Sequence, residues 1–413
     1  MGKRVQSSVK KKHILIFQSG EPLPCDSSDK RKMRAWNLID ELLENECKVS
    51  LISAKFDHST KTHRIKNNNV KNYHKNLEIF LIDSPGYKNN ISLSRLVDHI
   101  VLSWNLYLFL KRFKKKPDSV FIGFPPIETS IVLFQWARKI RSKIFLDVKD
   151  LWPEIFTYNE NVLKKNILKI CFFPYFKLYR FMVRNSDYLV SITQEFVEYL
   201  KHDAKRKSNK NIVTYLTSQS SRKIESRINK DDDCLTIGFA GSFMDAFDFQ
   251  SIRTAIKNVK TNTKLRFLLA GDGGSITEVR KLFADFKNVD FLGWLDGNKL
   301  DEFYLKIDLF IIPLKQRNDF SLSFPNKAMD ALSRSKPILC SCNGSLTNFL
   351  TKNHCGLYYD PGSNKDLAEI LDNFYLNKSL LKKMSTNIDK IYYKNFDHKK
   401  NYQKLVSKIL DTS

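Results

Sequence analysis

The fold is decided by residues 13–53, which read HILIFQSGEPLPCDSSDKRKMRAWNLIDELLENECKVSLIS. This stretch opens with a short β-rich run at His13–Phe17 that Ser19 and Gly20 close. A helical apolar face follows between about residues 30 and 45, and a second β-rich run lies at Val49–Ser53. A strand, a loop, a helix and a strand in this order form the first unit of a parallel, doubly wound sheet. We therefore predict an α/β fold.

The alternation of strand-like and helix-like runs continues through both halves of the chain. In the first half it predicts strands at Glu78–Ile82, Ser119–Gly123, Ile144–Asp147 and Tyr188–Ser191, and helices at Leu93–Phe113, Thr129–Ile140 and Lys164–Arg184. In the second half it predicts strands at Leu235–Phe239, Leu265–Ala270, Val289–Leu292, Leu309–Pro313 and Pro337–Ser341. The polar stretch Lys201–Asp233 separates them. Because 413 residues are too many for one ordinary core, we predict two Rossmann-like domains, 1–222 and 223–391, and a closing helix in 392–413.

The charge of the chain limits the classes of partner that it can attract but does not identify one of them. The formal net charge is +25, with 69 Lys and Arg against 44 Asp and Glu. Such a surface attracts anions, so nucleic acid, anionic lipid and phosphorylated metabolites are all candidates. A base-composition bias of the source would raise the lysine count equally well. The basic residues are spread along the chain and form no recognisable nucleic-acid module, so nucleic acid is not expected as a partner.

Cysteine usage and hydropathy indicate a cellular location. The seven cysteines are dispersed and form no C-x-x-C pair, which is typical of reduced thiols in the cytoplasm. No His, Cys or carboxylate cluster has metal-site spacing, so no metal is expected. No stretch reaches the 18 or so uncharged apolar residues that a spanning helix requires. We therefore expect a cytoplasmic protein that does not cross a membrane.

Two polar loops follow predicted strands of the first half. The first is Gly20-Glu21-Pro22-Leu23-Pro24-Cys25-Asp26, with Arg31 and Arg34 just beyond it. It lies at the carboxyl end of the first strand, where doubly wound sheets place their ligands, although a solvated surface loop would read the same. No G-x-G-x-x-G is present, so a dinucleotide site is not predicted there.

The second loop is Asp147-Val148-Lys149-Asp150-Leu151-Trp152-Pro153-Glu154. A Trp can stack on a sugar face while carboxylates accept hydrogen bonds from its hydroxyls. A carboxylate at this position could also act as a general base or stabilise developing positive charge, which makes Asp150 a catalytic candidate. The alternative is that Asp150 caps the following turn.

Glycine turns and a basic loop mark the second half. Gly241-Ser242 and Gly271-Asp272-Gly273 follow predicted strands, and missing side chains let a backbone approach a base or phosphate. The stretch 312–332, IPLKQRNDFSLSFPNKAMDAL, runs from a strand through a basic loop into a helix that starts near Pro325. Free N–H groups at a helix start suit a diphosphate, and Lys315, Arg317 and Lys327 could supply the countercharge. An ordinary capped helix with surface lysines is the alternative.

These motifs together resemble the retaining glycosyltransferases of family 4, which have the GT-B fold. The likeness is closest to the branch that builds bacterial capsule, exopolysaccharide or O-antigen, and it covers nearly the whole chain. The loop at 20–26 with the following arginines, and then His58 in the stretch 53–58, resembles the opening of that branch. Residues 147–154 resemble its D-x-x-D-L-W-P-E loop, and Phe324-Pro325-Asn326-Lys327 with Lys336-Pro337 resembles its P-N-K … G-K-P helix.

The resemblance implies a division of labour between the halves. The C-terminal half would bind a nucleotide sugar, a UDP-sugar on family grounds with GDP-sugars as the alternative, and the C-terminal helix would close back on the N-terminal domain. The transfer would retain anomeric configuration and need no metal or cofactor. The helix start at Ser323–Asn326 would stabilise the leaving diphosphate. The acceptor would be a polyprenyl-diphosphate-linked saccharide.

The candidate residues follow from these loops and the resemblance. The catalytic candidates are Asp150, Lys327 and Asp319. The donor-binding candidates are Gly241, Ser242, Gly271, Asp272, Gly273, Lys315, Arg317, Ser323, Phe324, Pro325 and Asn326. The acceptor-binding candidates are Glu21, Asp26, Arg31, Arg34, His58, Trp152 and Glu154.

The chain also departs from the family pattern. Asp319 stands where many relatives have the first Glu of an E-x7-E pair, and Lys327 replaces the second, which puts the usual ribose contact in doubt. The Arg and Lys that often follow the first donor-domain strand are absent from residues 241–248, and Lys315 and Arg317 are candidate replacements. Ser335 stands where a Gly is common.

The stretch 167–184, ILKICFFPYFKLYRFMVR, mixes aromatic side chains with Lys and Arg. A basic, aromatic helical face suits docking on anionic lipid, whereas a core-facing helix with solvated cations would show the same pattern. Pro174 argues against one continuous helix. We expect peripheral attachment to the inner face of the cell membrane.

Two other classes of function remain open at this point. Non-hydrolysing sugar-nucleotide epimerases share the two-domain architecture, so the fold alone does not exclude them. A basic nucleic-acid-binding protein is the second alternative, which the dispersed charge disfavours.

Overall fold

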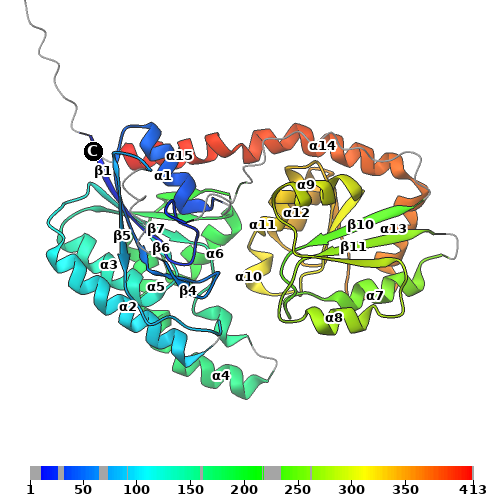
Figure 1. The fold of residues 1–413 in the computed structure, drawn as a ribbon, viewed down its shortest axis with the longest axis horizontal. Helices are drawn as coiled ribbons and strands as arrows, with labels where there is room; N and C mark the ends of the chain where they lie inside the picture. Colours follow the sequence, from blue (N-terminus) through cyan, green and yellow to red (C-terminus); the bar gives the residue numbers. More distant parts are fainter. Residues whose placement is uncertain are drawn as a thin grey trace, which may run out of the picture. The chain divides into compact units, whose positions relative to one another are not determined.

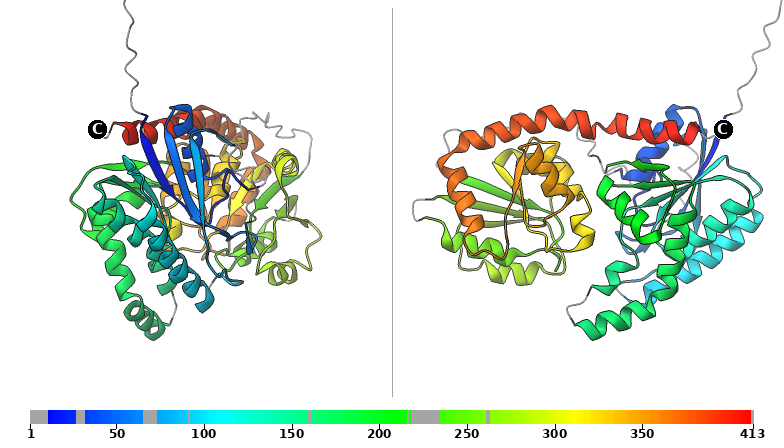
Figure 2. Two further views of the ribbon diagram at one scale, coloured as in Figure 1. Left: turned by 60° about the vertical axis from the view of Figure 1, so that its left-hand side comes forward. Right: turned by 180° about the vertical axis from the view of Figure 1, so that it is seen from behind.

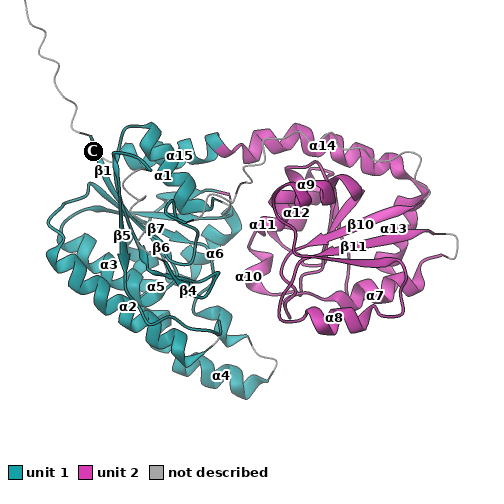
Figure 3. Cartoon of the chain, in the orientation of Figure 1, with its two compact units in different colours: residues 1–214, 399–413 teal, residues 215–398 magenta. Residues whose placement is uncertain are grey.

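The computed structural model describes residues 11–26, 32–64, 73–90, 92–158, 161–215, 217, 234–260 and 263–411. The chain forms two compact units (Figure 3). Unit 1 comprises residues 1–214 and 399–413, and unit 2 comprises residues 215–398. The division falls between Thr214 and Tyr215, whereas the boundary predicted near residue 222 lies outside the described residues. Both units are α/β, which confirms the predicted fold class.

Unit 1 is built on a parallel sheet with the strand order β5-β2-β1-β6-β7-β8-β9. Its strands are β1 His13–Phe17, β2 Lys48–Ala54, β5 Leu77–Ile82, β6 Ser119–Phe124, β7 Lys143–Val148, β8 Tyr188–Ser191 and β9 Asn211–Val213. The order reverses direction between β1 and β6, so the switch point of this doubly wound sheet lies there. The short strands β3 Phe56–Asp57 and β4 Thr62–His63 pair separately, antiparallel to each other.

Helices cover both faces of this sheet (Figure 1). They are α1 Arg34–Glu44, α2 Leu93–Arg112, α3 Ile127–Lys139, α4 Val162–Cys171, α5 Phe173–Asn185, α6 Gln194–Ala204 and, from the end of the chain, α15 His398–Leu410, with a 3-10 turn at Glu154–Thr157. The single helix predicted over 164–184 is two helices, because the chain breaks at Phe172 and Pro174 opens the second one. Proline suits a first helical turn, where its missing N–H would have no partner anyway.

The last helix completes the core of unit 1. Tyr402, Leu405, Val406 and Ile409 of α15 are buried in one cluster with Leu38 and its neighbours on α1. Figure 2 shows α15, in red, alongside α1, in blue. The predicted return of the C-terminal helix onto the N-terminal domain is therefore confirmed, although the element begins at His398 rather than at residue 392.

Unit 2 repeats the architecture with the parallel order β12-β11-β10-β13-β14-β15. Its strands are β10 Leu235–Ala240, β11 Leu265–Ala270, β12 Val289–Gly293, β13 Leu309–Ile312, β14 Ile338–Cys340 and β15 Gly356–Tyr358. Its helices are α7 Phe249–Asn258, α8 Ile276–Leu282, α9 Gly297–Lys306, α10 Asn318–Ser321, α11 Asn326–Leu332, α12 Ser345–Lys352, α13 Asp366–Leu376 and α14 Lys378–Phe396. The order reverses between β10 and β13, which defines the switch point of this sheet.

No helix within the described residues is both long enough and apolar enough to span a bilayer. The seven cysteines all lie within the described residues, and none of them forms a disulfide bond.

Candidate functional site

The strongest site geometry in unit 2 lies at the switch point between β10 and β13. The loop after β10 and the loop after β13 are joined by backbone hydrogen bonds: the Asp248 N–H donates to the Pro313 carbonyl at 2.7 Å, and the Lys315 N–H donates to the Ala246 carbonyl at 3.0 Å. The two loops therefore form one rigid rim at the carboxyl edge of the sheet, where open α/β sheets bind ligands.

The glycines of the rim allow two loops to pack backbone against backbone. A Cβ on Gly271 would lie 1.9 Å from the Gly241 carbonyl oxygen, and a Cβ on Gly273 would lie 2.3 Å from the Phe243 carbonyl oxygen. Both have positive φ, 127° and 153°, which L side chains rarely adopt. Close loop packing thus accounts for these glycines without a ligand, while the exposed Ser242 and Asp272 remain available for one.

Lys327 occupies the centre of this rim. Its ammonium lies 3.8 Å from the centroid of the Phe247 ring and 5.0 Å from that of Phe239, and a Cβ on Gly241 would lie only 2.8 Å from its Nζ. Burial lowers the pKa of Lys327 to about 7. Among the described residues, no carboxylate and no hydrogen-bond acceptor pairs with this ammonium. Among the described residues, only the ring faces of Phe239 and Phe247 interact favourably with the charge of this ammonium.

The start of α11 lies next to this lysine in the chain. Pro325 is the N-cap and has no side-chain hydrogen bond, and its carbonyl accepts the N–H of Ala328 at 2.9 Å. Within the described part of the chain, the N–H groups of Asn326 and Lys327 have no acceptor. Two free donors beside an unpaired ammonium form an arrangement that suits an anion.

Phe324 anchors this helix start rather than contacting a ligand. Its side chain is 4% exposed, and its ring packs against Phe349, Phe396 and Tyr215 at centroid distances of 5.5, 5.9 and 5.7 Å. The ring of Phe324 therefore serves the packing of this helix start, and the predicted donor contact of Phe324 stays a prediction. The neighbouring Ser323 is half-buried, with its hydroxyl on the Phe320 carbonyl at 3.3 Å.

The other predicted cations of the rim have partners. Arg317 makes a bidentate pair with Asp319, with N–O distances of 3.1 and 2.8 Å. Lys315 pairs with the exposed Asp245 at 2.7 Å. The roles predicted for Arg317 as countercharge and for Asp319 as a sugar contact therefore require that this pair open or bind a ligand together. Burial raises the pKa of Asp319, and Arg317 opposes that rise.

Lys336, which together with Pro337 resembles the K-P part of the family motif, has a structural role. Its side chain is fully buried and donates to the Ile307 carbonyl at 2.7 Å, and burial lowers its pKa to about 8. The preceding Ser335 has a φ of 57°, in the left-handed region that a glycine adopts at no cost. That conformation explains physically why a glycine would suit this position.

The carboxyl edge of the sheet in unit 1 holds a buried ion-pair network. Arg34 and Asp147, both without side-chain exposure, pair at 2.7 Å between Nη1 and Oδ1, and Arg34 also donates to the Thr214 carbonyl. Lys149 pairs with Glu21, whose other oxygen accepts the Ala35 N–H at 3.0 Å. These contacts tie together the loops after β1, β7 and β9. Glu21 and Arg34 therefore have structural partners, and their predicted contact with an acceptor stays a prediction.

Asp26 has a similar structural role. Both of its carboxylate oxygens accept from Arg64, at 2.8 and 3.2 Å, and Oδ2 also accepts the Leu23 N–H at 2.9 Å. Since Asp26 is paired with Arg64, an acceptor contact by Asp26 would have to share this pair, and it stays a prediction. Arg31, which was predicted with it, lies outside the described residues.

Trp152 and His58 belong to a cluster of aromatic and cationic side chains at the same edge. The Arg95 guanidinium lies 5.0 Å from the Trp152 ring and 5.4 Å from the Tyr87 ring. The Tyr87 hydroxyl lies 2.5 Å from Nδ1 of His58, and the Lys61 ammonium lies over the same Tyr ring at 4.5 Å. Burial and the neighbouring Lys61 and Arg95 lower the pKa of His58 to about 4, so its ring is neutral at physiological pH.

A buried acid–imidazole pair adjoins Trp152. His99 packs against Trp152 at 5.8 Å, and its Nδ1 lies 3.6 Å from Oε2 of Glu128. The Tyr175 hydroxyl donates to the other oxygen of Glu128 at 2.9 Å. Burial raises the pKa of Glu128 and lowers that of His99 to about 3. Sequence analysis missed this group and Arg95, for which the only signal was polar residues on otherwise apolar helices.

The remaining loop acids differ in exposure. Glu154 accepts hydrogen bonds from the hydroxyls of Tyr199 and, at 3.3 Å, Tyr158, which fastens the loop to α6. Asp150 is exposed, and its carbonyl accepts the Trp152 N–H at 2.9 Å. Asp150 thus remains the catalytic candidate of unit 1, while Glu154 has at least a positioning role.

The segment predicted to contact lipid divides in two. No residue of α4 is buried, and Val162, Leu163, Ile167 and Ile170 are 59–75% exposed. In contrast, Tyr179, Met182 and Val183 of α5 belong to the core. Within the predicted face at 167–184, the exposed apolar surface is therefore concentrated on α4 and continues to Phe173, while contact with lipid stays a prediction.

No metal site is apparent in the described residues, where no three His, Cys, Asp or Glu side chains are grouped to hold an ion.

Comparison with known proteins bears on the family. Residues 234–377 match the family model described as Glycosyl transferases group 1, and they lie within unit 2. No curated protein sequence matches the chain. The sequence match thus covers the part that contains the rim around Lys327, and it supports a glycosyltransferase.

Several solved structures have the same two-domain fold. A sucrose-phosphate synthase from Thermosynechococcus elongatus matches with a TM-score of 0.72 at 13% identity, covering 98% of this chain and 100% of that one. Anabaena HepE, in complex with UDP and glucose, matches with a TM-score of 0.65 at 13% identity, covering 96% and 99%. WaaG, a glycosyltransferase involved in lipopolysaccharide biosynthesis, matches with a TM-score of 0.66 at 12% identity, covering 95% and 98%. These likenesses establish the GT-B fold.

Proposed function

We propose that this chain is a glycosyltransferase that moves a sugar from a nucleotide sugar, most simply a UDP-sugar, to a lipid-linked saccharide. The observation that carries the proposal is the half-buried Lys327, whose ammonium lies against two phenylalanine rings without a counter-ion among the described residues, beside two free N–H groups at the start of α11. A buried cation without a counter-ion is costly unless a ligand supplies the opposite charge. A nucleoside diphosphate carries that charge, and Anabaena HepE was solved with UDP.

The donor geometry suggests how the leaving group is stabilised. When the bond between the anomeric carbon and the phosphate oxygen breaks, negative charge develops on the diphosphate while the acceptor oxygen forms the new bond. In this proposal Lys327 and the N–H groups of Asn326 and Lys327 neutralise that charge without a metal. The acceptor hydroxyl's proton leaves with the diphosphate, which is the balance expected for transfer with retention.

The acceptor side of the proposal rests on unit 1. Asp150 is exposed at the carboxyl edge of β7, and the cluster of Arg95, Lys61 and Trp152 combines cations with aromatic surface. Cations suit the phosphate of a lipid-linked acceptor, and aromatic rings suit its sugar. The exposed apolar residues of α4 alternate with Lys164, Lys165 and Lys169, which suits attachment to an anionic membrane surface.

Nucleotide binding tests the donor site. We expect isothermal titration with UDP at pH 6.5 to show an affinity loss of about 30-fold or more, roughly 2 kcal/mol, in Lys327→Met. Lys336→Met is the matched control, because Lys336 is also buried but bonded to a backbone carbonyl. An equal loss in both variants, or none in Lys327→Met, would place the diphosphate elsewhere.

A turnover assay distinguishes the proposed transferase from a sugar-nucleotide epimerase. We expect the protein to transfer sugar from one member of a nucleotide-sugar panel to a polyprenyl-diphosphate saccharide. Efficient epimerisation of UDP-GlcNAc without any acceptor would instead assign the site to an epimerase, because the same fold serves both reactions.

A further inference from the structure

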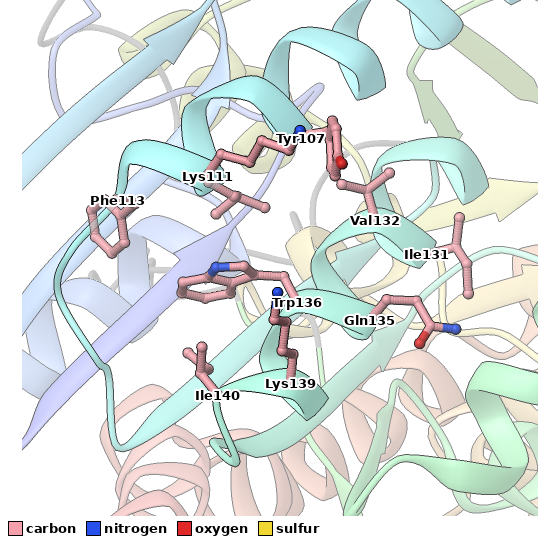
Figure 4. A pocket seen from close by; sticks show the side chains of 10 residues that line it. Tyr107, Lys111, Phe113, Ile131, Val132, Gln135, Trp136, Lys139 and Ile140 are labelled. Atoms are coloured by element: carbon pink, nitrogen blue, oxygen red, sulfur yellow. The ribbon is translucent and has the colours of Figure 1, made fainter.

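A cavity lies on unit 1 between the C-terminal halves of α2 and α3 (Figure 4). It has a volume of about 570 Å³, which falls in the range of small-molecule sites. Its walls are mostly apolar: Tyr107 and Phe113 line it from the α2 side, and Val132 and Trp136 line it from α3. The rings of Phe113 and Trp136 meet edge to face at 6.0 Å, which gives the cavity an aromatic wall.

Cations surround this apolar hollow. Lys111 and Lys139 line it, and the Lys111 ammonium lies 4.5 Å from the centroid of the Tyr107 ring. Six more exposed cations flank it in sequence: Arg112, Lys114, Lys116, Arg138, Arg141 and Lys143. Among the described residues, none of these eight cations forms an ion pair, whereas Lys115 pairs with Glu78. Lys111 and Lys139, the two cations that line the cavity, thus have no carboxylate partner among the described residues.

An exposed apolar stripe on α2 leads into the cavity. Leu93, Val97, Ile100 and Trp104 are 81, 52, 51 and 61% exposed, and Tyr107 at the cavity wall is 40% exposed. Their spacing of three and four residues places them on one face of the helix. A contiguous apolar stripe that ends in an apolar hollow is a feature of surfaces that contact another apolar phase.

We propose that this cavity binds one anionic phospholipid of the membrane. An acyl chain lies between Phe113, Val132 and Trp136, and the lipid phosphate is held by Lys111 and Lys139. Only a ligand with both an apolar chain and a negative head group satisfies both parts of the site. Nucleic acid would match the cations but leave the apolar walls unused. A second copy of this chain would bring eight like charges against eight.

The position of the cavity separates it from the transferase site. Helices that follow parallel strands run from the carboxyl edge of the sheet back to its amino edge, so the ends of α2 and α3 lie at the amino edge. Asp150 and the Trp152 cluster lie at the carboxyl edge. A lipid in the cavity would hold unit 1 on the membrane without occupying the acceptor site, and this proposal does not depend on the donor chemistry.

Vesicle binding with charge and shape variants tests the proposal. We expect the full-length protein to sediment with phosphatidylcholine vesicles that contain phosphatidylglycerol and not with phosphatidylcholine alone. Lys111→Glu with Lys139→Glu should weaken this binding at least about tenfold. Lys281→Glu with Lys306→Glu, which makes the same charge change on exposed residues of unit 2, should weaken it much less. Equal losses in both pairs would show general charge attraction and overturn the pocket.

A second measurement isolates the apolar part. Phosphatidylglycerol with brominated acyl chains should quench Trp136 fluorescence, so the quenching should drop in Trp136→Phe. Val132→Trp, which fills the cavity without changing charge, should weaken vesicle binding while the affinity for UDP stays unchanged. Undiminished quenching in Trp136→Phe would overturn the proposal, as would unchanged vesicle binding in Val132→Trp. If the wild-type protein does not bind UDP, that result contradicts the proposed function but not the lipid proposal.

Discussion

The carboxyl edges of the two sheets treat charge in opposite ways. In unit 1, Arg34, Asp147, Glu21 and Lys149 are buried and neutralise one another. In unit 2, the half-buried Lys327 lies beside two phenylalanine rings, and the described residues provide no counter-ion for it. The two sheets have the same relative strand order, and in each the order reverses beside the first strand of the unit. The comparison indicates that buried charge marks a ligand site where the fold leaves the charge uncompensated, and a structural site where the fold supplies its partner.

The largest effect expected from this comparison is on the stability of unit 1. Arg34→Met should lower the free energy of unfolding by about 3–5 kcal/mol, because it leaves Asp147 buried without its partner. Urea denaturation measures this loss. Arg180→Met is the control: Arg180 pairs with Asp203 at 2.8 Å, close to the 2.7 Å of the Arg34 pair, but is 40% exposed, so its loss should cost about 1 kcal/mol or less. Similar losses in both variants would contradict the structural role of the network.

At Lys327, in contrast, a substitution is expected to increase the free energy of unfolding. Its pKa of about 7 in the folded protein lies below the ordinary value of 10.5, so the unfolded chain binds more protons between pH 7 and 10.5. Burial of Lys327 therefore destabilises the fold most at pH 7 and below, and the penalty fades as the pH rises toward 10.5. Lys327→Met should raise the free energy of unfolding at pH 6.5 by about 1 kcal/mol or more and by less at pH 9.5. A variant that is less stable at pH 6.5 would refute the uncompensated cation.

A smaller effect is expected at the exposed acid of unit 1. Asp150→Ala should reduce turnover at least about tenfold, or roughly 1.4 kcal/mol of transition-state stabilisation, with little change in UDP affinity. Steady-state kinetics with the lipid-linked acceptor measure it. Glu21→Gln is a useful contrast, because that carboxylate is bound to Lys149 and should affect stability more than turnover. A normal rate in Asp150→Ala would remove this residue from the reaction.

The smallest effect is expected at Lys315. Its ammonium pairs with Asp245 on the surface, where the two side chains are 45 and 98% exposed. Exposed pairs contribute about 0–1 kcal/mol, so Lys315→Ala should change the unfolding free energy by less than about 0.5 kcal/mol. If UDP affinity nevertheless falls more than tenfold, Lys315 leaves Asp245 for the diphosphate, and the rim holds two available cations instead of one.

Most of the fold could be predicted from the sequence because its strands are buried, apolar and regularly spaced. The predicted limits of β1, β8 and β11 agree with the structure residue for residue. The short strands β3, β4, β9 and β15 were not predicted, since two or three residues carry no periodic signal. The break at Phe172 was indicated by Pro174, but its position was not.

The candidate site was predictable in location but only partly in role. The motif loops do lie at the carboxyl edges of the sheets, as the strand–loop–helix order implies. The structural pairs of Glu21 and Asp26 could not be predicted because their partners, Lys149 and Arg64, are distant in sequence and only the folded chain shows the pairs. The absence of a partner for Lys327 among the described residues is likewise a property of three-dimensional packing.

The packing of α15 has a consequence for how the protein is made. Residues 399–411 follow unit 2 in the chain, yet Tyr402, Leu405, Val406 and Ile409 fill the core of unit 1, whose strands precede unit 2. That core is completed only after unit 2 has been synthesised, so a fragment that stops at Thr214 exposes the apolar face of α1 to solvent. Expression of the isolated N-terminal half therefore requires these last residues to be grafted or supplied as a peptide.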